Sequence, residues 1–158
     1  MEVFEKLQEL LQRENARFRV ITHSAEGSSA RVAEIRGTAP GQGAKAMLCQ
    51  VKGVPGLLVL AVLSGDRKLD FKKLGQVAGG KKASLCPAEE ATATTGCPMG
   101  AVPPFSLWPE VRLIVDPQLI ERHEELAFNA GRLDTSMVLN TQDYLRIAQP
   151  LLADIVTD

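Results

Sequence analysis

Lys45 is the residue in this chain best placed to do chemistry. It follows three glycines, Gly37, Gly41 and Gly43, and begins the apolar run that continues over residues 46–49. An amine at such a point offers a fixed positive charge or, if it is desolvated, a nucleophile. The chain has few other side chains in a reactive pattern.

A second feature stands some fifty residues later, over residues 95–105. This segment contains Gly96 and Gly100 together with Pro98, Pro103 and Pro104. Proline restricts backbone shape and glycine allows close approach, so the segment predicts a rigid loop that presents main-chain groups. Together, the two features predict a site built from one amine and backbone groups.

Helices and strands that could position these features alternate along the chain. Apolar spacing predicts helices over residues 3–11, 29–36, 71–77 and 87–95. Ser28 or Ser29 and Asp70 are the expected caps, Pro87 is expected in the first turn of the fourth helix, and Gly37, Gly79-Gly80 and Gly96 are the expected stops. Thr141 is expected to cap a last helix that carries Leu145, Ala148 and Leu151 on one face.

Strands are predicted over residues 16–20, 45–51, 57–63, 111–115, 125–129 and 136–139. The second and third are separated by Gly53-Val54-Pro55-Gly56, which predicts a hairpin at the centre of the sheet. The expected fold is therefore α/β, a single domain over residues 1–158 with a mixed sheet.

The net charge of −1 conceals a strong asymmetry. Residues 31–82 hold ten basic and three acidic side chains, a net charge of +7, whereas residues 83–158 have a net charge of −7. The basic segment predicts a positive face that could attract a polyanion, although its lysines could equally be solvated surface residues. The candidates for contact with such a polyanion are Arg31, Arg36, Lys72, Lys73, Lys81 and Lys82.

Several other kinds of site are disfavoured. The segment 41–46 matches G-x-G-x-x-A, with Asp66 as a possible ribose ligand, but a helix precedes it and a strand follows, the reverse of a dinucleotide site. Three cysteines without a C-x-x-C motif and two isolated histidines predict no zinc site, disulfide framework or catalytic triad. No metal and no cofactor are expected. The amphipathic start and the lack of a long apolar run predict a cytoplasmic protein without a membrane partner.

The order of these motifs resembles the YbaK/prolyl-tRNA-synthetase-associated family of trans-editing aminoacyl-tRNA deacylases. The resemblance rests on Gly43-Ala44-Lys45 before a strand, on the G-x-x-x-P loop from Gly100 to Pro104, and on Ala130-Gly131 near the end. The segments 34–39, 41–45, 128–131 and 143–150 are most similar to the YeaK branch.

This resemblance implies that the mixed sheet is barrel-like and surrounded by helices. It also implies a metal-free hydrolase that cleaves the ester between a small amino acid and the 3′ end of a mischarged tRNA. Alanine, serine, threonine, cysteine and 2-aminobutyrate are all candidates, with a preference for serine or threonine. The family's functional lysine corresponds to Lys45, and its loop makes Gly100 and Pro104 the other catalytic candidates. The implied substrate-binding residues are Gly43, Ala46, Met47, Ala101, Val102, Pro103, Asn129 and Gly131.

The implied partners are the acceptor end of tRNA and an aminoacyl-tRNA synthetase, and no DNA. Two alternatives remain open from the sequence. A noncatalytic tRNA- or synthetase-binding module would keep the fold without hydrolysis, and a Schiff-base enzyme would use the amine of Lys45 as a nucleophile.

Overall fold

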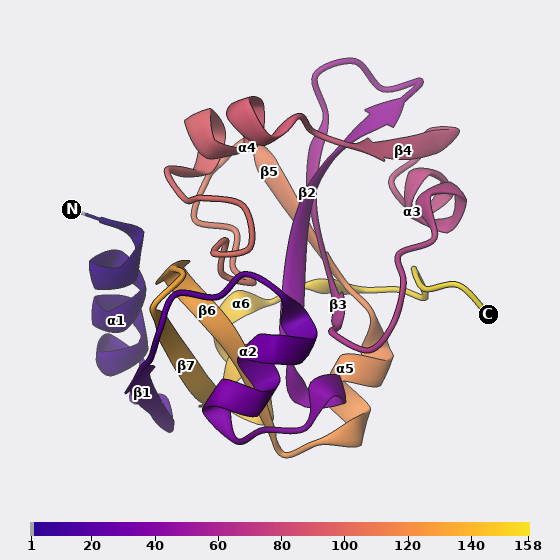
Figure 1. Cartoon of the computed structure of the whole chain (residues 1–158). Coiled ribbons are helices and arrows are strands. Elements are labelled where there is room, and N and C mark those ends of the chain that lie inside the picture. The colour runs from indigo at the N-terminus through magenta and orange to yellow at the C-terminus, as the bar shows by residue number, and fades with distance from the viewer. Residues whose placement is uncertain (1) are drawn as a thin grey trace.

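The protein, seen here in a computed structural model that describes residues 2–158, is built around a five-stranded mixed sheet (Figure 1). The strand order is β4 (Lys82–Leu85), β2 (Ala44–Lys52), β3 (Leu58–Ser64), β5 (Val111–Val115) and β8 (Leu151–Leu152). The central pair, β2 and β3, is an antiparallel hairpin, as predicted, and β3, β5 and β8 run parallel. Residues Val59–Ser64 of β3 are all buried, because both faces of this sheet are covered.

A second sheet has three antiparallel strands in the order β1 (Phe18–Thr22), β7 (Thr135–Asn140) and β6 (Glu125–Arg132). A single parallel bridge between Gly43 and Ala127 brings β6 beside the start of β2. The pairing of β6 with β7 is irregular between Asn129 and Arg132, where Gly131 has a φ of 82°. Such a bulge is typical of strands that change direction beside a site.

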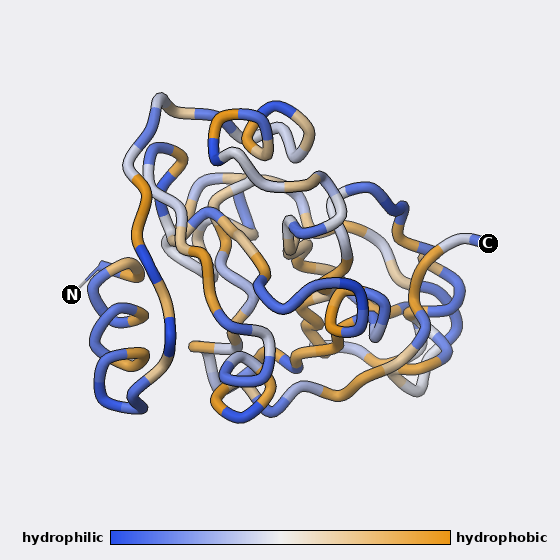
Figure 2. The backbone as a smooth tube through the Cα atoms, turned by 90° about the horizontal axis from the view of Figure 1, so that it is seen from below, coloured by the Kyte–Doolittle hydropathy of each residue, from blue (hydrophilic) through white to orange (hydrophobic). Residues whose placement is uncertain are grey.

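Six helices and a 3₁₀ turn surround these sheets in the described chain. Their bounds are α1 (Val3–Arg13), α2 (Ser29–Arg36), η1 (Pro40–Gln42), α3 (Phe71–Val77), α4 (Ala88–Thr95), α5 (Pro117–Arg122) and α6 (Thr141–Ala148). In Figure 2, α1 turns its hydrophobic residues toward the rest of the molecule and its hydrophilic residues outward. None of these helices is long and apolar enough to cross a membrane.

Local signals place several helix ends as the sequence predicts. The Asp70 carboxylate accepts hydrogen bonds from the backbone N–H groups of Lys72 and Lys73 and caps α3. Gly37 and Gly96 end α2 and α4 in the left-handed conformation, with φ values of 75° and 73°.

The end of the chain differs from the prediction. Asn140, rather than Thr141, caps α6 by accepting a hydrogen bond from the N–H of Asp143. The helix ends at Ala148, because Gln149 is left-handed (φ 48°) and is followed by Pro150. Leu151 therefore lies in β8 rather than in the helix.

Other elements were not predicted or were misplaced. The short elements β4, β8 and α5 were missed, and β1 begins at Phe18 rather than at residue 16. The term barrel-like fits only loosely, because the strands of residues 2–158 form two sheets and neither closes on itself. The mixed α/β class is confirmed, and two hydrophobic clusters fill the two faces of the five-stranded sheet.

Candidate active site

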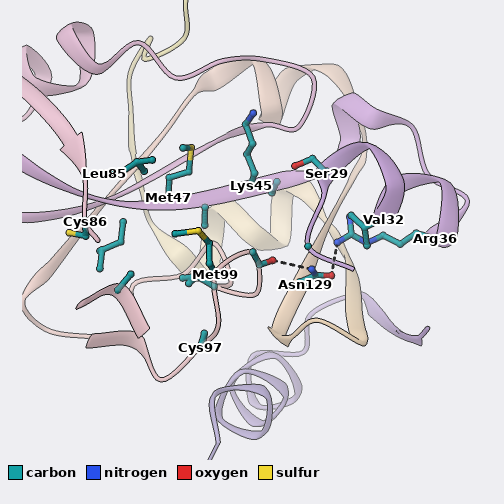
Figure 3. Close-up of a pocket in the computed structure, with 18 residues that line it drawn as sticks. Ser29, Val32, Arg36, Lys45, Met47, Leu85, Cys86, Cys97, Met99 and Asn129 are labelled. Atoms are coloured by element: carbon teal, nitrogen blue, oxygen red, sulfur yellow. Dashed lines mark hydrogen bonds between the residues drawn. The ribbon is translucent and has the colours of Figure 1, made fainter. Parts of the chain in front are cut away.

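A cavity of about 240 Å³ opens between β2, α2 and the loop that follows α4 (Figure 3). One end is apolar and is lined by Met47, Leu85 and Cys86. The other end, on the right of Figure 3, has the polar side chains of Arg36 and Asn129. No aspartate, glutamate or histidine lines this cavity, so within the described chain its only charged groups are the cations of Lys45 and Arg36.

Lys45 lies near the start of β2, opposite Leu63 of β3. Its ammonium donates a hydrogen bond to the backbone carbonyl of Arg67, and in Figure 3 the side chain points away from Asn129. Burial lowers the pKa of Lys45, the nearby Asp66 carboxylate opposes this change, and Lys68 adds to it. The amine is thus held at the edge of the cavity by a neutral acceptor.

The proline loop forms the opposite wall, through Gly100 and Val102. Within residues 2–158, the N–H groups of these two residues have no hydrogen-bond acceptor. The loop is anchored to two other elements: the Ala101 carbonyl accepts a hydrogen bond from the N–H of Gly131 on β6, and the Pro104 carbonyl accepts one from the hydroxyl of Tyr144 on α6. The loop is therefore held in place, and its Gly100 and Val102 N–H groups are unused in residues 2–158.

Asn129 on β6 connects this loop to α2. Its side-chain amide donates to the carbonyls of Glu26 and Gly100, each at 3.0 Å. Its Oδ1 accepts from Arg36 Nη2 at 3.1 Å and from the Ser136 hydroxyl at 3.0 Å. All four hydrogen bonds that an amide side chain readily makes are therefore formed. Asn129 is buried and positions its neighbours, whereas a solvent-facing turn residue would leave some of these groups free.

Ser136 extends these contacts into a hydrogen-bond network. Its hydroxyl oxygen accepts a hydrogen bond from Arg36 Nε at 2.8 Å and lies 2.7 Å from Nε2 of His23. The other ring nitrogen of His23, Nδ1, lies 2.8 Å from the carbonyl of Ser24, which can only accept. The network links β6, β7 and α2 with His23, the residue that follows β1.

The structure brings most of the predicted site residues together and leaves some apart. The cavity is lined by Gly43, Lys45, Ala46, Met47, Gly100, Val102 and Asn129. The remaining predicted residues, Ala101, Pro103, Pro104 and Gly131, do not line it. Ala101, Pro103 and Pro104 are buried in the loop's support, and Gly131 packs against Val3 of α1.

The predicted basic residues do not form one group. Lys72 on α3, Lys82 on β4 and Lys81 just before β4 are exposed, and the two elements pack against each other. Lys73 is paired with Asp154 and Asp158, each at 3.1 Å, and Arg31 lies 3.7 Å from Glu26. Arg36 is separated from these exposed residues, because it lies in the cavity wall.

Several cavity residues were missed from the sequence. Ser29 and Val32 lie on α2, Cys86 precedes α4, and Cys97 and Met99 follow it. The polar and charged residues of α2 were interpreted as caps or surface cations, because the helix pattern does not show which face meets a cavity. Asp66, the rejected ribose ligand, pairs with Arg122 at 2.9 Å.

The sequence family follows from the same segments that build this cavity. A profile of the aminoacyl-tRNA editing domain matches residues 23–147, a range that includes Lys45, the proline loop and Asn129. The chain belongs to the aminoacyl-tRNA editing domain family. This membership confirms the resemblance inferred from the sequence.

Members of this family are similar to the chain over almost its whole length. It is 52% identical over 151 residues to the Multifunctional Ser/Thr-tRNA deacylase ProXp-y of Escherichia coli (strain K12), which covers 95% of this chain and 90% of that protein. Among solved structures, the hypothetical protein APE2540 matches 96% of this chain and 99% of that chain, with a TM-score of 0.85 and 24% identity.

A second solved structure supports the same fold. A protein provisionally described as a trans-editing enzyme for prolyl tRNA synthetase matches all of this chain and 99% of that chain, with a TM-score of 0.83 at 20% identity. At these identities the two structures establish the editing-domain fold alone.

Proposed function

We propose that this protein is a trans-editing deacylase that hydrolyses the ester of tRNAs mischarged with serine or threonine. The observation that carries the proposal is the 52% identity, over 95% of the chain, to a deacylase whose name specifies Ser/Thr-tRNA. A cavity of about 240 Å³ supports it, because this volume is below the roughly 300 to 1,000 Å³ typical of pockets for drug-sized ligands. Such a cavity suits a small aminoacyl group.

The chemistry needs little from the protein. An aminoacyl ester is already activated by the neighbouring ribose hydroxyl, so a site has to orient the ester, admit a water molecule and stabilise the negative charge that develops on the carbonyl oxygen. The free N–H groups of Gly100 and Val102 are suitable donors for the aminoacyl moiety. Lys45, at the edge of the cavity, is positioned to bind the phosphate that precedes the terminal adenosine.

The need for such a second site follows from the limits of binding selectivity. A single methylene in a hydrophobic pocket contributes only about 1 to 3 kcal/mol, so synthetases misacylate tRNA with amino acids that are smaller than or isosteric with the correct one. We further propose, from the family resemblance, that the protein works in the cytoplasm on tRNA delivered by a synthetase. It would use the exposed Lys72, Lys81 and Lys82 to approach the tRNA.

The direct test uses tRNAs charged with alanine, serine, threonine, cysteine, 2-aminobutyrate or proline. The unsubstituted protein is expected to hydrolyse Ser-tRNA and Thr-tRNA fastest, and Lys45→Ala is expected to lose this activity. Tight tRNA binding with hydrolysis no faster than the spontaneous rate would instead identify a noncatalytic module. Borohydride trapping of an adduct at Lys45 with a small carbonyl compound would indicate the Schiff-base alternative.

A further inference from the structure

Arg36 is a cation without a carboxylate partner. It is the last residue of α2, and its side chain lies half-buried at the polar end of the cavity. Both of its hydrogen-bond acceptors, Ser136 Oγ and Asn129 Oδ1, are neutral. None of the ion pairs found within residues 2–158 includes Arg36. A buried charge without a counter-charge is costly, and such groups are common where a ligand supplies the complement.

The guanidinium group of Arg36 has unused hydrogen-bond donors. Of its five N–H groups, two are used, one from Nε and one from Nη2. The other three have no acceptor in the described part of the chain. Nη1 lies 3.8 Å from the position that a Cβ on Gly43 would occupy, so the unused edge runs along the cavity wall formed by the start of β2. Glycine at residue 43 leaves that edge uncovered.

The two cations of the cavity differ in depth. Arg36 is bound to the buried side chains of Ser136 and Asn129, whereas Lys45 is bound to the carbonyl of Arg67 at the exposed edge. Burial lowers the pKa of Arg36 to about 10, which leaves it protonated at neutral pH. An aminoacyl-adenosine has a phosphate on the far side of the ribose from the ester, so the outer cation suits the phosphate and the inner one suits the ester.

We propose, on the basis of the proposed function, that Arg36 is a catalytic residue that donates hydrogen bonds to the carbonyl oxygen of the scissile ester. Water attacks the carbonyl carbon, and the π electron pair moves to the carbonyl oxygen, where the guanidinium stabilises the negative charge. The pair returns as the bond to the ribose oxygen breaks. The ribose oxygen takes up a proton, and the amino acid leaves as its carboxylate with release of the second proton of the water.

The network around Arg36 prepares it for this role. Ser136 and Asn129 hold one edge of the planar guanidinium, so the free edge has a fixed direction before substrate binds, and preorganised donors of this kind are the most effective. Asn129 also holds the carbonyl of Gly100 and so fixes the proline loop relative to Arg36. Asn129 is accordingly a positioning residue, because its own amide has no free group for the substrate.

The test compares Arg36→Met and Arg36→Lys with Arg19→Met, a matched change at an exposed arginine on β1. Single-turnover hydrolysis of Ser-tRNA and Thr-tRNA is measured over a range of enzyme concentrations. We expect Arg36→Met to lower the saturating rate about 100- to 1,000-fold for both substrates, the usual effect of removing an oxyanion donor. The half-saturating enzyme concentration should stay within about threefold of the unsubstituted value, and Arg19→Met should change neither quantity.

Arg36→Lys serves as a second variant in case Arg36→Met fails to fold, because it keeps the positive charge. Lysine cannot bind Ser136, Asn129 and the ester in one plane. This variant is expected to lose at least about tenfold in saturating rate. A raised half-saturating concentration with an unchanged saturating rate would assign Arg36 to the phosphate and overturn the proposal. Loss confined to Ser-tRNA and Thr-tRNA, with hydrolysis of tRNA charged with alanine preserved, would also overturn it, in favour of recognition of the side-chain hydroxyl.

The same data separate this proposal from the function on which it rests. If the unsubstituted protein hydrolyses Ser-tRNA and both Arg36 variants match it, only the role of Arg36 is wrong. If the unsubstituted protein hydrolyses none of the charged tRNAs, the deacylase function itself is wrong.

Discussion

The hydroxyl of Tyr144 donates a hydrogen bond to the carbonyl of Pro104 at 2.6 Å, and so ties helix α6 to the end of the proline loop. The ring is fully buried and contacts Phe105 edge-on, with centroids 5.1 Å apart. Burial raises the pKa of Tyr144, so the hydroxyl stays protonated and remains a donor. The loop that lines the cavity is therefore supported from the hydrophobic core.

Tyr144→Phe is expected to destabilise the protein by about 1 to 3 kcal/mol, because it leaves the Pro104 carbonyl buried without a donor while keeping the aromatic contact. Urea unfolding measures the change, with Gln142→Ala on the exposed side of the same helix as the control. We also expect slower Ser-tRNA hydrolysis in folded Tyr144→Phe. Unchanged stability would show that the carbonyl finds another donor.

Lys45→Met should abolish deacylation without lowering stability. Burial is the largest influence on Lys45 and lowers its pKa, so the folded state holds this proton less tightly than the unfolded state. The contribution of Lys45 to stability consequently rises as the pH increases through its folded pKa toward 10.5, the ordinary lysine value.

The measurement for Lys45→Met is thermal unfolding between neutral pH and pH 10. At neutral pH the variant should unfold at a temperature no lower than that of the unsubstituted protein. Any increase in the unfolding temperature should become smaller at alkaline pH. A clear loss of stability at neutral pH would mean that the bond to the Arg67 carbonyl outweighs the cost of burial.

Asp143 should make the protein sensitive to strong acid. Its carboxylate accepts hydrogen bonds from the side chain and backbone of Arg17, which lower its pKa to about 2 from 3.8. Because the folded-state pKa is depressed, the stabilisation is complete above about pH 4 and is lost as the pH falls toward 2. Denaturant unfolding across this range should show a smaller pH dependence in Asp143→Asn than in the unsubstituted protein.

Cysteine chemistry should be absent from the folded protein. Burial raises the pKa of all three thiols, that of Cys49 to about 12, although Cys86 and Cys97 line the cavity. A thiol reagent at neutral pH should modify the native protein slowly, because the thiolate is the reactive form. After unfolding, the reagent should modify all three cysteines. Rapid inactivation by iodoacetamide would contradict this and point to a reactive cysteine at the site.

Local signals made much of the fold predictable. The glycines that end α2 and α4, the Asp70 cap and the turn between β2 and β3 act within a few residues, so the sequence order alone reveals them. The division into two sheets was not predictable, because it depends on which distant strands pair. The two-residue strand β8 exists only because β5 offers a free edge, and no local pattern marks it.

The site was predictable to a similar extent. Lys45 and Gly100 stand in recognisable motifs, whereas Arg36 looks like any basic residue at the end of a helix. Its burial arises from Ser136 and Asn129, which lie 100 and 93 residues away along the chain. Long-range contacts of this kind leave no trace in spacing or composition, and for this reason Arg36 was grouped with exposed lysines.

The hydrogen bonds of Asn129 also set the moment during protein synthesis at which the cavity can first exist. The Asn129 amide is bonded to Glu26, 103 residues earlier, and its partner Ser136 is on the following strand. A growing chain therefore has no complete cavity until β6 and β7 have left the ribosome, since contacts of such separation form late. We expect that unfinished chains leave the charged tRNAs around the ribosome intact.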